Sequence, residues 1–452
     1  MHQLPEADRD AIRLAQDPQF PRWLEQVTAT GGCAHPVHLS GSTTTLYPDT
    51  GEILHQYDTR NEPGERLLVR CRNRRATVCP ACSRLHAGDT FHLVRAGLLG
   101  GRNIPATVRH QPRLFVTLTA PSFGPVHRAT DLCRPRRDRE RCEHGRPLGC
   151  GAVHDPDERS VGQPLCRDCY DYTGHVLWHA HASKLWDRFV IDVRRRLASS
   201  VGLVQSRFAE QARLSFARVA EYQKRAAVHV HAIVRLDGPD GPTDEPPGWG
   251  STDRLTDAVR ASARRVLVHT LYSPAVGELA LRWGAQVDAR PLRADGDGPD
   301  DDAVAAYVAK YVTKGASETG AGSDHPLRTW HDIDTAPVTE HVRTLMRTCW
   351  RLGGLPEYES LNLRTWAHTL GYRGHILTKS RAYSTTYAAL RAERAHHMGH
   401  VDVPEAITDR HWRFVGSGHT PGAALIAAGI ADDLAEARRL SAEAKHEGEW
   451  CR

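Results

Sequence analysis

The chain has 452 residues, 40% hydrophobic and 25% charged, so it is long enough for two or three globular domains and too apolar to be wholly disordered. Its net charge of +5 neither requires nor excludes a nucleic-acid partner, because local patches of charge matter more than the sum. The start, MHQLPEADRDAIRLAQ, has no apolar signal region, and no stretch reaches the roughly 18 apolar residues of a membrane span. We therefore expect a cytoplasmic protein without a membrane partner, in which the eleven cysteines favour metal ligands over disulfides.

The predicted elements of the first half surround two cysteine-rich segments. Residues 1–26 predict helix, and residues 33–82 hold the first cysteine group. The sequence RLFVTLTAPSFG (113–124) predicts a strand that ends at a Pro/Gly break. Residues 131–172, rich in Arg, Cys and His, predict an irregular insert stapled by metal. Apolar residues at helical spacing then predict a helix over 175–198.

The second half begins with the clearest pattern. RLSFARVAEYQKRAAVHVHAIVRLDG (213–238) alternates, passes through a basic turn and alternates again, which predicts a β-hairpin. The elements expected after it are a helix capped by Ser251 or Thr252, a strand at 281–292, a helix at 305–315 and a mostly helical tail at 340–452.

The second strand of the hairpin, VHVHAIVRL (228–236), carries a candidate metal site. Alternate side chains of a strand share a face, so His229 and His231 lie together opposite an apolar face. If the hairpin turns about Arg225, Glu221 lies directly opposite His229, which would give a site of two histidines and one carboxylate. A shift of one residue would send Glu221 to the apolar face, and a lone H-x-H pair is more often a solvated or half-buried strand face.

The predicted helix AAYVAKYVTKG (305–315) places Tyr307 and Tyr311 on one face, one turn apart. A phenol with a pKa near 10 is a poor nucleophile unless it is activated. A metal at the histidine pair could neutralise charge on a phosphodiester, and Lys310 or Lys314 could pair with the phosphate or the phenolate. Taken alone, two tyrosines at this spacing are more often packing residues.

The first cysteine group predicts a structural zinc site. The C-x-x-C pair of Cys79 and Cys82, joined by Cys33 and Cys71, would give four thiolates, the tetrahedral set that Zn²⁺ prefers. His35 and His38 are rival ligands, and a set of reduced free thiols is the alternative.

The second cysteine group offers more ligands than one tetrahedron needs. Cys166 and Cys169 form another C-x-x-C pair, and Cys142 and Cys150 are the residues we expect to complete it. Cys133, His144 and His154 also lie in this segment, the two histidines being alternative ligands. The chain is thus expected to bind about two structural zinc ions, which would hold loops too poor in apolar residues to fold alone.

Three motifs together resemble a known superfamily. FVTLT (115–119), HVH (229–231) and YVAKYVTK (307–314) resemble, in that order, the three motifs of HUH endonucleases, and more narrowly those of two-tyrosine rolling-circle initiators. The wider chain resembles the RepSA-like replication initiators of actinobacterial plasmids and integrative elements. The stretches that carry this likeness are CRNRRATVCPACS, TLTAPSFGPVH, PLCRDCYDY, AEYQKRAAVHVHAIVRLDG and HTLGYRGHILTKSRAYSTTYAALR.

The resemblance implies a function and its cofactors. Members of this group nick single-stranded origin DNA through a 5′-phosphotyrosine, and the freed 3′-OH primes a host polymerase that works with a host helicase. By the same resemblance Tyr311 would attack first, Tyr307 would act in a later strand transfer, and the catalytic metal would be Mg²⁺ or Mn²⁺.

The resulting fold prediction is α+β, with an HUH-type antiparallel sheet and flanking helices. The expected domains are an N-terminal zinc region at 1–107, a nicking domain at 108–320 with the zinc insert at 131–172, and a mostly helical region at 321–452, a candidate for DNA binding. Rival functions are a two-tyrosine HUH transposase and a zinc-stapled DNA-binding regulator without catalysis. A conjugative relaxase is disfavoured, because its tyrosine usually precedes its histidines.

Overall fold

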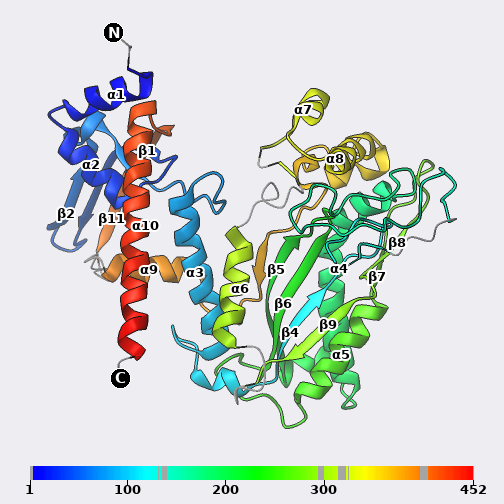
Figure 1. The fold of residues 1–452 in the computed structure, drawn as a ribbon. Helices are drawn as coiled ribbons and strands as arrows, with labels where there is room; N and C mark the ends of the chain where they lie inside the picture. The colour runs from blue at the N-terminus through cyan, green and yellow to red at the C-terminus, as the bar shows by residue number, and fades with distance from the viewer. Residues whose placement is uncertain are drawn as a thin grey trace. The chain divides into compact units, whose positions relative to one another are not determined.

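Figure 1 shows the computed structural model, which describes residues 4–130, 132–134, 140–293, 300–313, 322–323, 325–397 and 406–450. The chain divides into two compact units. Unit 1 consists of Met1–Asp89 and Tyr387–Arg452, and unit 2 is Thr90–Thr386. Both boundaries expected from the sequence, near residues 107 and 320, fall inside unit 2.

Unit 1 joins the two ends of the chain in one antiparallel sheet. Its strands run in the order β11-β1-β2, with β3 paired to β1. The tail was expected to be mostly helical, but β11 is a long strand that pairs along the whole of β1. The elements of this unit are α1 (Glu6–Ala15), α2 (Phe20–Ala29), β1 (Val37–Leu46), β2 (Ile53–Asp58), β3 (Leu67–Val69), α9 (Tyr387–His397), β11 (Ile407–Ser417) and α10 (Pro421–Trp450), while α3 (Pro80–Leu99) begins here and continues into unit 2.

Unit 2 is built on a five-stranded antiparallel sheet with the order β10-β5-β6-β4-β9. The hairpin and the strands and helices around it form close to where the sequence predicts them, and Ser251 caps α5 by accepting the N–H of Arg254. The elements are β4 (Arg113–Leu118), α4 (Tyr172–Ser199), β5 (Arg213–Tyr222), β6 (Val228–Asp237), α5 (Thr252–Arg265), β7 (Leu267–His269), β8 (Ala280–Arg282), β9 (Val287–Pro291), α6 (Asp301–Thr313), α7 (Trp330–Thr335), α8 (Glu340–Leu352) and β10 (Leu377–Lys379).

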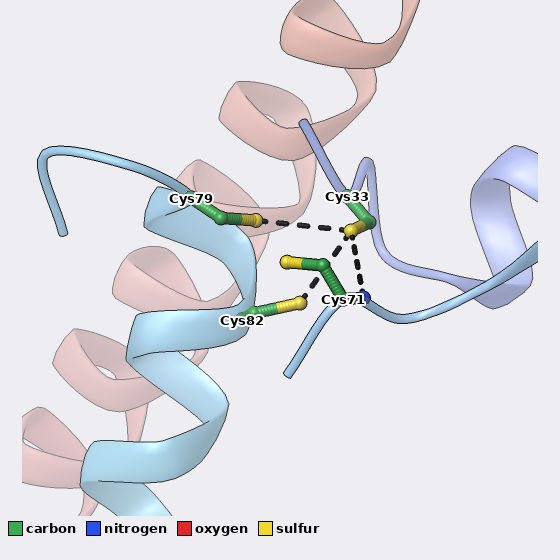
Figure 2. A group of neighbouring side chains, drawn as sticks. All are labelled: Cys33, Cys71, Cys79 and Cys82. Carbon is green, nitrogen blue, oxygen red and sulfur yellow. Dashed lines mark hydrogen bonds between the residues drawn. The ribbon is translucent and has the colours of Figure 1, made fainter. Parts of the chain in front are cut away.

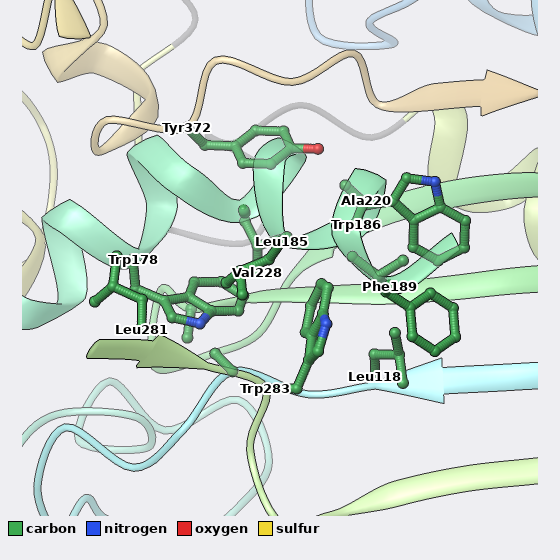
Figure 3. Close-up of a cluster of buried hydrophobic side chains, with 14 of the residues drawn as sticks. Leu118, Trp178, Leu185, Trp186, Phe189, Ala220, Val228, Leu281, Trp283 and Tyr372 are labelled. Carbon is green, nitrogen blue, oxygen red and sulfur yellow. The ribbon is translucent and has the colours of Figure 1, made fainter. Parts of the chain in front are cut away.

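The two faces of this sheet have different roles. Val228 and the alternate residues after it in β6 face α4 and α5, where they are fully buried in the main core. Figure 3 shows this core, in which Trp178, Leu185 and Phe189 of α4 pack onto the strands. Each such side chain stabilises the fold by about 1.5–3 kcal/mol through burial. The opposite face carries several polar residues of β5 and β6 and is covered by α6.

The strand predicted over 281–292 is two short strands in different sheets. β8 pairs with β7, whereas β9 pairs with β4. Gly284 lies at the break between them, and its N–H donates to the carbonyl of Thr119. A Cβ at Gly284 would lie 2.6 Å from the carbonyl oxygen of Ala120, so only glycine allows the chain to change sheets this close to β4.

Buried histidines connect α4 and α8 to the hairpin turn. His179 accepts the N–H of Val228 at Nε2, 3.1 Å away, and donates from Nδ1 to the carbonyl of Leu370. His341 donates from Nε2 to the carbonyl of Arg225 at 3.1 Å. Burial lowers the pKa of His179 and of His341 to about 4, because an imidazolium would lose its hydration there.

We expect the folded state to lose stability as the pH falls from about 6.5 to about 4. The pKa of each of these histidines is lower in the folded than in the unfolded chain, so the unfolded chain binds the proton first and gains in population as the pH falls. His341→Gln keeps a donor for the Arg225 carbonyl but cannot titrate, so its urea midpoint should fall less steeply with pH. Loss of bound metal in acid affects parent and variant alike, and equal slopes for the two proteins would contradict the prediction.

Among the described helices, none has the length and apolar character needed to cross a membrane.

Candidate functional site

The β5-β6 hairpin has the predicted register. Glu221 lies directly opposite His229, and Val219 lies opposite His231. The turn spans Gln223–Ala227, where the Gln223 amide donates to the Ala227 carbonyl. Glu221, His229 and His231 therefore share the sheet face under α6.

His231 is the centre of a polar cluster on this face. Its Nε2 lies 3.1 Å from Oε2 of Glu221 and 3.2 Å from the hydroxyl of Tyr307. Its Nδ1 lies 3.0 Å from Oγ1 of Thr117, which is its cross-strand neighbour on β4. The ring of Phe115 stacks on the imidazole with centroids 5.9 Å apart. Four chain segments thus meet at one side chain.

The Thr117 hydroxyl can accept a hydrogen bond from Nδ1–H of His231 or donate to an unprotonated Nδ1. With the proton on Nδ1, the Nε2 lone pair is free for a cation placed between it and Glu221, next to Tyr307. Thr117 belongs to the strand predicted over 113–124. Its pairing with His231 depends on the β4-β6 register, which no local pattern reveals.

His229 lies at the rim of the same face and lines a groove. Burial, together with the neighbouring His231 and Arg225, lowers the pKa of His229 to about 4. The imidazole is therefore neutral at pH 7 and keeps a lone pair for a ligand. The rings of His229 and His231 are 5.9 Å apart, centroid to centroid.

A buried ion pair positions α6 over the sheet. Arg113, at the start of β4, is fully buried and donates Nη1 to both carboxylate oxygens of Asp301, at 3.0 and 3.1 Å, and to the carbonyl of Leu98 at 2.8 Å. Burial raises the pKa of Asp301 although Arg113 opposes the shift. Since a helix rises about 1.5 Å and a strand about 3.3 Å per residue, this anchor brings Tyr307 and Tyr311 to the level of His231.

The two tyrosines lie together beside His231, as their spacing predicts. Their ring centroids are 4.6 Å apart, and those of Tyr307 and Tyr311 lie 5.2 and 6.2 Å from His231. Both side chains are half-buried. Burial and the charge of Glu221 raise the pKa of both phenols, so neither is activated by the surrounding side chains alone.

The structure describes only one of the two lysines that were candidates for a contact with the phosphate or the phenolate. Lys310 lies on α6 and is exposed, unlike the half-buried tyrosines on either side of it in the helix. Lys314 lies outside the described residues. A role for either lysine at the phosphate stays a prediction.

The donor set on this face suits a divalent ion, although it is more open than the cysteine clusters described below. Glu221 and His231 are in contact, and His229 contributes a neutral imidazole. In the described part of the chain, the ligand atoms of each Cys/His cluster all lie within 4.8 Å of one another, whereas those of these three residues do not. Two imidazoles and one carboxylate are chemically fit to hold a transition metal or Mn²⁺, with positions left for substrate.

The first cysteine cluster joins the four residues predicted from the sequence. Figure 2 shows Cys33, Cys71, Cys79 and Cys82 with their sulfur atoms directed toward a common centre. The Sγ of Cys33 lies 3.8 Å from that of Cys79 and 3.6 Å from that of Cys82. Cys79 directly precedes α3 and Cys82 lies in its first turn, where the helix dipole favours thiolates.

Backbone amides point at these sulfur atoms. The N–H of Ala34 donates to Sγ of Cys79, and the N–H of Cys71 donates to Sγ of Cys33, both at 3.3 Å. Hydrogen bonding with Cys33 lowers the pKa of Cys79, and the same contact raises the pKa of Cys33. Four such close sulfur atoms cannot all be thiolates unless a cation balances them, and the donor set therefore fits Zn²⁺.

The insert between β4 and α4 contains two clusters in place of the single site expected. One cluster is His127, Cys133, Cys150 and His154, and the other is Cys142, His144, Cys166 and Cys169. Along the chain these ligands come in four pairs: His127 and Cys133, Cys142 and His144, Cys150 and His154, and Cys166 and Cys169. The first and third pairs form one cluster, and the second and fourth pairs form the other. Between residues 119 and 171 the described residues contain no helix or strand, so an ion at each cluster would supply cross-links that regular secondary structure does not.

The contacts in both clusters are those expected of zinc ligands. Nε2 of His154 lies 3.3 Å from Sγ of Cys150, while its Nδ1 lies 2.8 Å from Oε2 of Glu158, the carboxylate that orients a ligating histidine. Nδ1 of His144 lies 3.2 Å from Sγ of Cys169. Although partial desolvation opposes it, hydrogen bonding from backbone amides lowers the pKa of Cys142 to about 7.

The structure therefore changes the expected second zinc site. Cys150 does not lie with Cys142, Cys166 and Cys169; His144 takes that place. His127 was not considered as a ligand, because it lies outside the cysteine-rich stretch, and its only signal was a histidine beside the Pro/Gly break after β4. In place of the expected two or so zinc sites, the described residues form three clusters of four side chains, each fit to bind zinc.

The comparisons with known proteins agree on one family. A family model described as "Replication initiator protein, pSAM2" (RepSA) matches residues 19–432. A "Replication initiator protein" from Streptomyces ambofaciens is 44% identical over 451 residues, which covers 96% of this chain and 95% of that protein. No solved structure matches the chain. Because the match extends over nearly the whole sequence, this chain belongs to the RepSA family of replication initiator proteins.

Proposed function

We propose that this protein starts rolling-circle replication by nicking one strand of its element's origin DNA through a phosphotyrosine intermediate. The observation that carries the proposal is the contact of His231 with both Glu221 and Tyr307, while Tyr311 packs beside them. Three separate sequence motifs thereby meet on one sheet face, which a purely structural role for each motif would not require. The HUH-type fold named from the sequence is part of this proposal.

In the proposed reaction the phenol oxygen of Tyr311 attacks a phosphodiester phosphorus. The new bond joins the tyrosine oxygen to the 5′ phosphate, and the bond from phosphorus to the 3′ oxygen breaks. The phenol proton leaves to water, and the departing 3′ oxygen takes up a proton to become a hydroxyl. That hydroxyl would prime a host polymerase, aided by a host helicase, and Tyr307 would act in the later strand transfer.

His229, His231 and Glu221 would hold a Mg²⁺ or Mn²⁺ ion in this reaction. The bound ion would neutralise negative charge on the phosphodiester and on the phenolate. Thr117 would accept the hydrogen bond of Nδ1–H when Nε2 of His231 serves as a ligand, and the Arg113–Asp301 pair would keep both tyrosines at that level. The three Cys/His clusters would each hold a structural zinc ion.

A covalent-adduct assay tests the proposal. The purified protein is incubated with labelled single-stranded DNA from its own origin, with and without Mn²⁺, and resolved on a denaturing gel. We expect a metal-dependent protein–DNA adduct that His231→Ala abolishes and that His269→Ala, which changes an exposed histidine on β7, retains. A folded parent that binds origin DNA but forms no adduct would instead be a non-catalytic DNA-binding regulator.

A further inference from the structure

A groove of about 630 Å³ begins at His229 and runs between the hairpin turn and the cysteine-rich insert. Its walls come from the end of β4, the insert, the β5-β6 turn and the segment before β9, all within unit 2. This volume lies within the range of about 300–1,000 Å³ that is usual for ligand sites in proteins.

The described residues that line the groove include no aspartate or glutamate. They include four cations, Arg128, Arg134, Lys224 and Arg225. The guanidinium of Arg225 donates to the backbone carbonyls of Ala120 and Pro121. These hydrogen bonds hold the side chain in place without neutralising its charge, because neither acceptor is a carboxylate. The groove is therefore electropositive along its length, although the whole chain is close to neutral.

The cation best placed to bind a ligand is Arg128. Its side chain is exposed, and it has no ion-pair partner among the described residues. Lys224 is also exposed, and its contact with Asp157, at 3.5 Å, is too weak and solvated to neutralise it. Both charges therefore remain available to an anion in the groove.

The wall that carries Arg128 is rigidly built. The N–H of Arg128 donates to Sγ of Cys133 at 3.1 Å, and the adjacent His127 is a member of the same cluster. A Cβ at Gly162, which also lines the groove, would lie 2.2 Å from the carbonyl oxygen of Lys224, so the insert packs directly on the hairpin turn. Closure of the cluster thus fixes Arg128 relative to His229.

We propose that this groove binds the phosphates of single-stranded DNA next to the bond that is cut. The groove is continuous with His229, carries uncompensated cations, and lacks the carboxylates that would repel a phosphate. Single-stranded DNA is the ligand favoured because its backbone is flexible enough to follow a groove that passes from the sheet face into an insert. The inference rests on the proposed nicking function, since it assigns the strand path of that same site.

Fluorescence anisotropy with a labelled single-stranded origin oligonucleotide tests the groove. It is recorded without divalent ion, so that binding is measured apart from chemistry. Arg128→Gln should weaken binding about 5- to 10-fold at low salt and reduce the slope of log K against log salt by about 0.7, the value for one lost phosphate contact. The matched control is Arg264→Gln, which removes an exposed arginine of α5 outside the groove and should leave both quantities unchanged.

The outcomes separate this proposal from the proposed function. If Arg128→Gln and Arg264→Gln both bind like the parent, the groove is not the strand path, even where the parent forms its adduct normally. If Arg128→Gln alone weakens binding but the parent forms no adduct, the groove stands and the nicking function falls. Tighter binding of duplex than of single-stranded DNA, lost in Arg128→Gln, would overturn the single-strand assignment.

Discussion

Replacing Tyr311 with phenylalanine is expected to reduce formation of the covalent protein–DNA adduct by at least about 1,000-fold. The change removes only the attacking oxygen, because a phenylalanine ring can keep the packing against Tyr307 and His231. The pKa values of both phenols are raised by their surroundings, so under the proposed mechanism the rate would depend on how well a bound cation stabilises the phenolate of Tyr311.

Tyr307→Phe is the matched variant for this experiment. It removes the hydroxyl that contacts Nε2 of His231 but keeps Tyr311. We expect it to form the first adduct within about tenfold of the parent rate and to fail in the second strand transfer. The measurement is adduct yield over time on a denaturing gel with labelled origin strand. An adduct that survives in Tyr311→Phe and disappears in Tyr307→Phe would reverse the roles of the two tyrosines.

Removal of one candidate zinc ligand in unit 1 is the second change with a large expected effect. Cys79→Ser should lower the zinc content by one ion per chain, from about three, because it breaks the cluster of Cys33, Cys71, Cys79 and Cys82. Structural zinc contributes directly to folding, so we expect the melting temperature of unit 1 to fall by about 10 °C or more. Metal analysis and calorimetry of the purified variant measure the two effects.

Cys349→Ala is the control for the zinc experiment. Cys349 is buried in the core of unit 2 and belongs to none of the three Cys/His clusters. Its removal should destabilise the core to some extent but leave the zinc content unchanged. A parent protein that contains no zinc, or a Cys79→Ser variant that keeps the full amount, would contradict the assignment of this cluster.

The candidate site could be predicted where short-range patterns carry the information. Alternation along 228–236 placed His229 and His231 on one face, and the helical spacing at 305–315 paired Tyr307 with Tyr311. The sequence placed Glu221 opposite His229 only on the condition that the hairpin turns about Arg225, and the structure has that register. Such features depend on the geometry of one strand, one helix or one hairpin, which neighbouring residues define.

Contacts between distant segments decided the rest of the molecule. Thr117 meets His231 only through the β4-β6 register, and Arg113 meets Asp301 across nearly two hundred residues of chain. The pairing of β1 with β11 likewise joins the two ends of the sequence. Each of these contacts depends on which helices and strands the buried core brings together. A hydrophobic pattern of period two or 3.6 identifies a strand or a helix but not the element that it packs against.

The cysteine-rich insert shows this division within a single segment. Its composition was sufficient to predict an irregular region held by metal, because too few apolar residues are present to build a core. Composition was not sufficient to assign the ligands, because each cluster joins two pairs of residues that are not consecutive along the chain. Cys150 joins His127, Cys133 and His154, and His144 takes the fourth place beside Cys142, Cys166 and Cys169. Four pairs along a chain can form two clusters by joining neighbouring pairs or by joining alternate pairs. Which of these forms depends on the path that the folded chain takes past β4 and the hairpin turn.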